Sequence, residues 1–89
     1  MARLLVKGAE DALAQNTAGA KIFSNARLVR VVNTTANAYL VTLVAAVGGS
    51  TLGSFTLAGG ESVELEKEPL NGIFAAAAAV KASAIGYSN

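Results

Sequence analysis

The chain has 89 residues, enough for one domain, and it contains no cysteine and no histidine, so we expect no disulfide, no metal site and no cofactor. Its seven lysines and arginines are scattered and its formal net charge is +1, which disfavours the concentrated positive face that nucleic-acid binding needs. Hydrophobic residues make up 53% of the chain and charged residues only 15%, against roughly 25% charged in average soluble domains. This deficit of charge predicts a surface partly covered by other chains, with an apolar-surfaced monomer as the alternative.

The first 20 residues are expected to form a short strand followed by a loop or arm. Residues 2–6 are an apolar run, and residues 8–20 (GAEDALAQNTAGA) are polar and rich in alanine. The cluster at 16–19 stops any helix there. Two interpretations of 8–20 remain open: a surface loop, or an arm that orders on a neighbouring subunit, because structureless loops of this length are uncommon unless they are functional.

From residue 21 to residue 89 the hydrophobic pattern has a period of two and predicts a single β domain. Residues 27–32 are rich in β-branched side chains and end at a turn cluster, 33–37. Residues 38–47 are apolar on both faces, which predicts a central strand or one covered by a partner. That stretch is far shorter than the roughly 20 residues of a membrane span. The chain is therefore expected to be made in the cytoplasm and to have no membrane partner.

The next two strands are separated by glycine turns. Residues 48–50 (GGS) are expected to form a hairpin turn, and residues 52–57 return as a strand before the turn at 58–60. In the following strand, 61–67, alternation points Val63 and Leu65 inward and the intervening serine and glutamates to water. Pro69 ends this strand because it has no N–H to donate.

The last part of the chain contains five consecutive alanines, residues 75–79. Alanine favours helix, but so short a helix is unstable by itself, and the run lies between two β-like segments. We therefore predict the end of one strand, a turn and the start of the next, with a short helix as the alternative. Six to seven strands follow from this reading, and they indicate an all-β fold, a single small antiparallel β-sandwich or barrel.

Glu64 and Glu66 belong to the main acidic cluster and lie about 7 Å apart on one face of their strand. A same-face stripe on an exposed strand offers no pocket, so it is expected to be a solvated face, with a contact to a neighbour's arginine or lysine as the alternative. Catalysis or metal binding there is disfavoured. With no histidine, the usual base for a serine or threonine nucleophile is missing, and we expect no enzyme activity.

The remaining candidates for an interface are Arg27, Arg30 and Tyr39, besides the two glutamates. Arg27 and Arg30 have odd spacing on one strand and are expected to face opposite ways, so that one of them lies at a rim or interface, where arginine is favoured. The aromatic residues, Tyr39 and Tyr87 among them, are expected to serve mainly in the core of so small a domain.

Residues 26–89 resemble small β-sandwich virion proteins of tailed bacteriophages, especially those that infect cyanobacteria and other marine bacteria. The resemblance is carried by the set VRVVNTT, FTLAGGESVE and EKEP together with the ending 80–89. Each piece alone is ordinary β sequence, whereas the set is distinctive. The alanine run departs from the more polar segment expected at that place.

The resemblance implies a structural role on the phage particle, most simply a capsid decoration or cement protein that bridges capsomers and stabilises the head. The implied partners are the major capsid protein and copies of the chain itself, and a trimer would suit the three-fold positions of a capsid. The implied location is the virion surface. The alternatives are a neck or tail subunit, or a surface module that binds glycans or a receptor.

Overall fold

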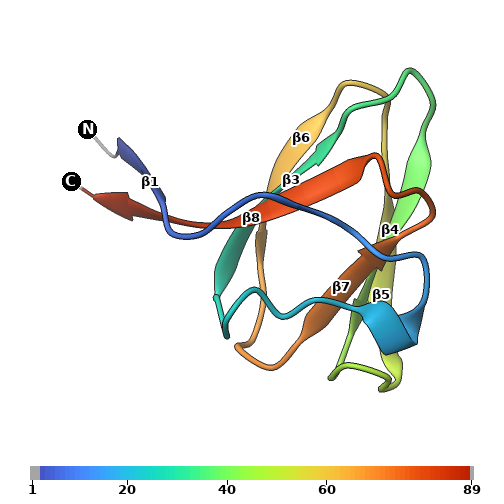
Figure 1. Cartoon of the computed structure of the whole chain (residues 1–89), viewed down its shortest axis with the longest axis horizontal. Helices are drawn as coiled ribbons and strands as arrows, with labels where there is room; N and C mark the ends of the chain where they lie inside the picture. Colours follow the sequence, from blue (N-terminus) through green and yellow to red (C-terminus); the bar gives the residue numbers. More distant parts are fainter. Residues whose placement is uncertain (1–2, 89) are drawn as a thin grey trace.

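The computed structural model describes residues 3–88, which form two antiparallel sheets stacked face to face (Figure 1). The larger sheet has the strand order β1-β8-β3-β6, and β2 also pairs with β8. The smaller sheet has the order β5-β4-β7. The strands are β1 Arg3–Val6, β2 Asp11–Ala12, β3 Leu28–Asn33, β4 Tyr39–Val44, β5 Thr51–Leu57, β6 Ser62–Glu66, β7 Gly72–Ala75 and β8 Val80–Ser88. The predicted all-β sandwich is confirmed, but residues 3–88 form eight strands rather than six to seven, because the pattern does not reveal the two-residue β2.

The alternation of buried and exposed residues along β3 and β6 follows the sequence pattern. Val29 and Val31 of β3 are fully buried between the sheets. Val63 and Leu65 of β6 pack against the same core cluster, while the glutamates between and after them are exposed. Because successive side chains of a strand point to opposite faces, the inward residues of both strands supply one wall of the core. The predicted orientation of β6 is therefore confirmed.

The apolar strand predicted at residues 38–47 is the central strand of the smaller sheet, as expected from its two apolar faces. β4 lies between β5 and β7. It is shorter than predicted, because the pairing with β5 shifts register between Leu43 and Val44 and the strand ends there. Residues 45–50 then form the connection, in which the Ala45 N–H donates to the Ser50 carbonyl over 2.9 Å.

The alanine run forms the predicted turn between two strands. β7 ends at Ala75 and β8 begins at Val80, whose N–H donates to the Ala77 carbonyl over 3.2 Å. The buried alanines, Ala75 and Ala82, belong to the core cluster. Neighbouring strands outweigh the helical preference of alanine here, because pairing within the sheets satisfies the backbone on both sides of the turn.

The segment 8–20 packs against the two sheets of its own chain. Leu13 has only 1% of its surface exposed, and its N–H donates to the Val80 carbonyl of the larger sheet. The Ala14 carbonyl accepts from Ala75 N–H of the smaller sheet, and Lys21 exchanges two backbone bonds with Ile73. A short 3-10 turn, Thr17–Gly19, lies between these contacts. The segment thus contacts both sheets. Over the described residues, the predicted ranges 1–20 and 21–89 therefore pack as one unit.

Candidate interaction surface

A two-stranded ribbon made of β1 and the end of β8 extends beyond the sandwich (Figure 1). β1 pairs with β8 from Arg3 opposite Ser88 to Val6 opposite Ile85. On its other side, β8 is paired with β3 only as far as Ala84. The final residues of β8 therefore have one neighbouring strand among the described residues. Such a two-stranded ribbon is only marginally stable by itself in water, so contact with another surface would stabilise it.

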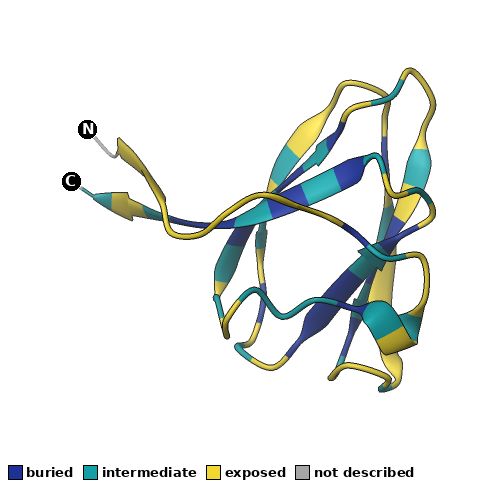
Figure 2. Ribbon diagram, in the orientation of Figure 1, coloured by how far each residue is buried: buried dark blue, intermediate teal, exposed yellow. Residues whose placement is uncertain are grey.

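The ribbon exposes large apolar side chains, and β1 is exposed along its whole length (Figure 2). The exposed fractions are 46% for Leu4, 40% for Leu5, 76% for Val6 and 44% for Tyr87. Single exposed apolar residues are ordinary, but Leu4, Val6 and Tyr87 share one face of this short ribbon and make a contiguous apolar surface, whereas Leu5 points to the other face. Surfaces of that kind commonly mark sites of protein–protein contact.

On the outer face of the larger sheet, the ribbon meets the charged residues of β3 and β6. The Tyr87 hydroxyl donates to the Glu64 carboxylate, which ties the end of β8 to β6. Arg30 lies opposite Glu64 on one side and Ser83 on the other. A shallow groove between the ribbon and β3 is lined by Leu4, Val6, Gly8, Glu10, Arg30, Ser83 and Ile85. We call the residues Leu4, Val6, Arg30, Glu64, Glu66 and Tyr87 the outer patch.

The structure brings together three of the five interface candidates named from the sequence: Arg30, Glu64 and Glu66. Arg27 lies just before β3, where its guanidinium pairs with the Glu68 carboxylate over 3.4 Å, and both side chains are largely exposed. Tyr39 lies on the smaller sheet, half-buried, and packs against the core cluster. It is therefore separate from the outer patch.

Three members of the outer patch were not singled out by sequence reasoning: Leu4, Val6 and Tyr87. Tyr87 was expected to serve in the core, and that expectation was wrong because β8 outruns β3 and carries the tyrosine beyond the sandwich. The sequence held no local signal for this, because the offset between β8 and β3 depends on long-range pairing.

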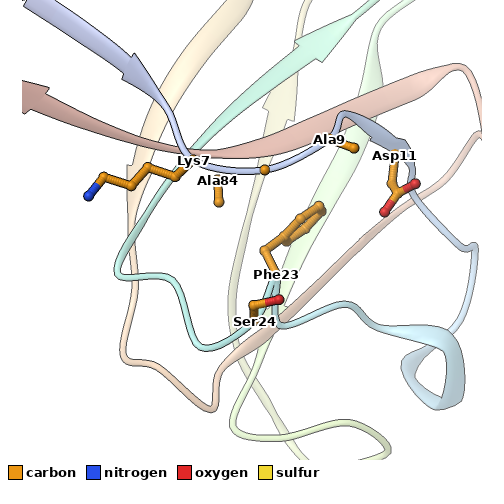
Figure 3. A pocket seen from close by; sticks show the side chains of 7 residues that line it. Lys7, Ala9, Asp11, Phe23, Ser24 and Ala84 are labelled. Carbon is orange, nitrogen blue, oxygen red and sulfur yellow. The ribbon is translucent and has the colours of Figure 1, made fainter.

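A small cavity lies between the N-terminal segment and the turn at residues 23–25 (Figure 3). That turn has positive φ at three successive residues that are not glycine, with values of 54°, 56° and 64°. The Phe23 ring projects into the cavity, with Lys7 and Asp11 at opposite ends. The Asp11 carboxylate lies 3.8 Å from the Lys21 ammonium. The cavity therefore offers an apolar wall and two separated charges, rather than a paired acid and base.

Lys67 is the one basic side chain among the described residues that is almost fully buried, with 4% of its surface exposed. Its ammonium donates to the carbonyls of Glu68 and Pro69 over 3.3 and 3.2 Å. Burial removes water from the charged form and lowers the pKa of Lys67 below its ordinary value of 10.5. The contacts are local, so Lys67 stabilises the bend after β6.

Within residues 3–88 there is no helix long and apolar enough to cross a membrane. The same range contains no group of three or more acidic side chains placed to share a metal ion. Comparisons of the chain with protein-family models, curated proteins and solved structures give no match.

Proposed function

We propose that this protein is a non-enzymatic structural subunit of a phage particle, a decoration or cement protein that binds the major capsid protein and further copies of itself. The observation that carries the proposal is the projecting ribbon, whose apolar side chains Leu4, Val6 and Tyr87 are 46%, 76% and 44% exposed. A cement subunit needs such a surface, because it gains its binding energy by burying apolar area on other chains.

The composition of the outer patch also supports a protein partner. Tyrosine and arginine are enriched at interface centres, and the patch combines Tyr87 and Arg30 with aliphatic side chains. The glutamates of β6, Glu64 and Glu66, are the polar rim of the patch. On a repeating lattice, weak contacts of this kind multiply when several subunits are linked, so that modest single contacts give stable attachment.

The particle surface is the proposed location, after synthesis in the host cytoplasm. A place on the neck or tail is the alternative structural role, and the same ribbon would serve there. Three-fold positions on the shell would suit a trimer. A cryo-EM map of the native particle discriminates these locations, because density for the sandwich must then appear on the shell, the neck or the tail.

The direct test uses capsids of the encoding phage assembled without this protein. We expect the purified chain to co-sediment with them and to raise the temperature at which they disrupt. Val6→Ser together with Leu4→Ser should abolish both effects. Leu52→Ser is the matched control, since Leu52 is 57% exposed on the smaller sheet and should leave binding unchanged.

Failure of the unmodified chain to bind shell, neck or tail would overturn the structural role. Two further measurements address the other classes of function. A reproducible hit on a glycan array that is lost with Tyr87→Ala would favour a receptor-binding module. Turnover in a broad hydrolase screen would contradict the non-enzymatic assignment.

A further inference from the structure

The larger sheet has two open edges, β1 at one side and β6 at the other. The backbone hydrogen bonds at the ends of these strands fix which groups face outward. Lys7 N–H donates to the Ala84 carbonyl, and Lys67 N–H donates to the Arg27 carbonyl. Since hydrogen-bonded and non-hydrogen-bonded pairs alternate in an antiparallel ladder, the even-numbered residues of β1 and of β6 direct their N–H and C=O groups away from the sheet. Unpaired edges of this kind are templates for another strand.

Strand direction makes these two edges compatible with each other. All pairings in the sheet are antiparallel, and its main path contains four strands. Directions alternate along that path, so β1 and β6 run in opposite directions. A second copy placed beside the first in the same orientation therefore presents its β6 antiparallel to β1 of the first. The sheet then continues from copy to copy with its alternation intact.

Charge favours the pairing of β1 with β6 over the two symmetric pairings, β1 with β1 and β6 with β6. Strand β1 and the residue after it carry Arg3 and Lys7 and no acidic side chain, while Glu10 and Asp11 follow farther along the same edge, outside the stretch that pairs. The β6 side carries the exposed glutamates at 61, 64, 66 and 68, whereas its one lysine, Lys67, is buried. Two β1 edges facing each other would place like positive charges together, and two β6 edges would do the same with negative charges. Pairing β1 with β6 places opposite charges together.

We propose that the chain assembles head to tail, with β1 of one copy paired antiparallel to β6 of the next. The alternation of hydrogen-bonded and non-hydrogen-bonded pairs along these edges allows the register in which Leu5 lies opposite Val63. In that register Lys7 lies opposite Glu61, and the outward backbone groups of Leu4 and Val6 meet those of Glu64 and Ser62. The partner is thus a second copy of this chain, whose edge strand β6 lies beside β1 and continues the sheet.

Head-to-tail contacts close into a ring where the rotation between copies permits it and otherwise form a filament. β1 lies beyond the end of β3 while β6 lies beside it, so neighbouring copies are staggered along the strand direction. A closed ring then has strands tilted relative to its axis, as in a barrel. This contact deepens the proposed role as a repeated subunit, but it is formed in solution without any capsid and can be tested by itself.

Proline substitutions at outward-facing N–H groups test the contact. Val6→Pro blocks the β1 edge and Glu64→Pro blocks the β6 edge, and neither removes a backbone hydrogen bond within the sheet. We expect the unmodified chain to sediment as an oligomer and each variant as a folded monomer. A mixture of the two retains one intact β6 edge and one intact β1 edge, so it should give a dimer of twice the monomer mass and no larger species.

Two controls keep this experiment decisive. Ser54→Pro blocks the open edge of β5 and should leave the oligomer intact. Tyr87→Phe loses the hydroxyl bond to Glu64, as Glu64→Pro does, and should also remain oligomeric. A monomeric unmodified chain overturns the proposal. So does an oligomer that persists in Val6→Pro or is lost only in Ser54→Pro, since the contact would then lie elsewhere.

A charge exchange gives a second test, in which Lys7→Glu changes the charge alone and Glu61→Lys also removes the bond from Ala58 N–H to the Glu61 carboxylate. Lys7→Glu and Glu61→Lys should each raise the dissociation constant of the self-association about three- to tenfold, because an attraction across the exposed edge becomes a repulsion. In an equimolar mixture, every contact between the two different variants brings opposite charges together, so assemblies in which the variants alternate should recover the affinity of the unmodified chain. Absence of recovery in the mixture would contradict the assigned register.

Discussion

The side-chain amide of Asn33, at the end of β3, donates to the carbonyl of Leu57, at the end of β5, over 2.9 Å. This bond crosses from the larger sheet to the smaller one at a fully buried position. The same amide donates to the Asn37 carbonyl over 2.7 Å, and its oxygen accepts from the N–H and hydroxyl of Thr35. One side chain therefore fixes both sheets and the loop that joins β3 to β4.

Replacing that side chain should be among the most destabilising single changes. Asn33→Ala leaves the Leu57 carbonyl without its side-chain donor and removes the support of the loop, and we expect a loss of about 3 kcal/mol in the free energy of unfolding. Urea denaturation measures it. Thr34→Ala is the matched control: its exposed hydroxyl bond to Ala79 should be worth about 1 kcal/mol or less. Equal losses in the two variants would contradict the bridging role of Asn33.

The packing of segment 8–20 against the two sheets depends on one buried leucine, Leu13. Leu13→Ala removes a side chain that is 1% exposed and lies in the core cluster, so the expected loss is about 2–4 kcal/mol. Leu52→Ala, at an exposed leucine of β5, should change stability by less than about 0.5 kcal/mol. Thermal unfolding of both variants compares them directly. A small loss at Leu13 would mean that the segment adds little to the sandwich.

Two glycines with opposite surroundings give a test of backbone packing. A Cβ added at Gly59 would lie 2.5 Å from the Ala36 carbonyl carbon, so Gly59→Ala should cost about 1–3 kcal/mol. A Cβ at Gly53 would meet nothing within 4 Å. Gly53→Ala is therefore expected to be neutral or to stabilise the strand by up to about 1 kcal/mol. Chemical denaturation of the two variants should give changes of opposite sign or clearly different size.

The buried lysine predicts a dependence of stability on pH. Because burial lowers the pKa of Lys67 in the folded chain, the folded state binds fewer protons than the unfolded state between that lowered pKa and 10.5. The contribution of Lys67 to stability should therefore increase as the pH rises through this window. The measurement is the free energy of unfolding of the unmodified chain minus that of Lys67→Met. This difference should become more positive as the pH rises to 10.5, and a constant difference would contradict the prediction.

Local patterns determined most of the fold. The alternation around Val63 and Leu65, the double apolar faces of residues 38–47 and the glycine turns each specify a strand or its end within a few residues. Even the alanine run was assigned correctly as a turn between strands, because its neighbours are β-like. Arg30, Glu64 and Glu66 were candidates from the same alternation, which places them on an outward face.

Tertiary structure alone decided which strands are neighbours and where they end relative to one another. Nothing local in residues 3–6 or at Tyr87 states that β1 and β8 continue together past β3, yet this offset exposes the ribbon and creates the outer patch. The packing of Leu13 against the sheets and the hydrogen bond from Asn33 to Leu57 likewise depend on partners far away in the chain. Periodicity reports which face of a strand is apolar, whereas register and sheet order come from long-range pairing. The sequence therefore determined the sandwich, and only the assembled sheets determined its open edges.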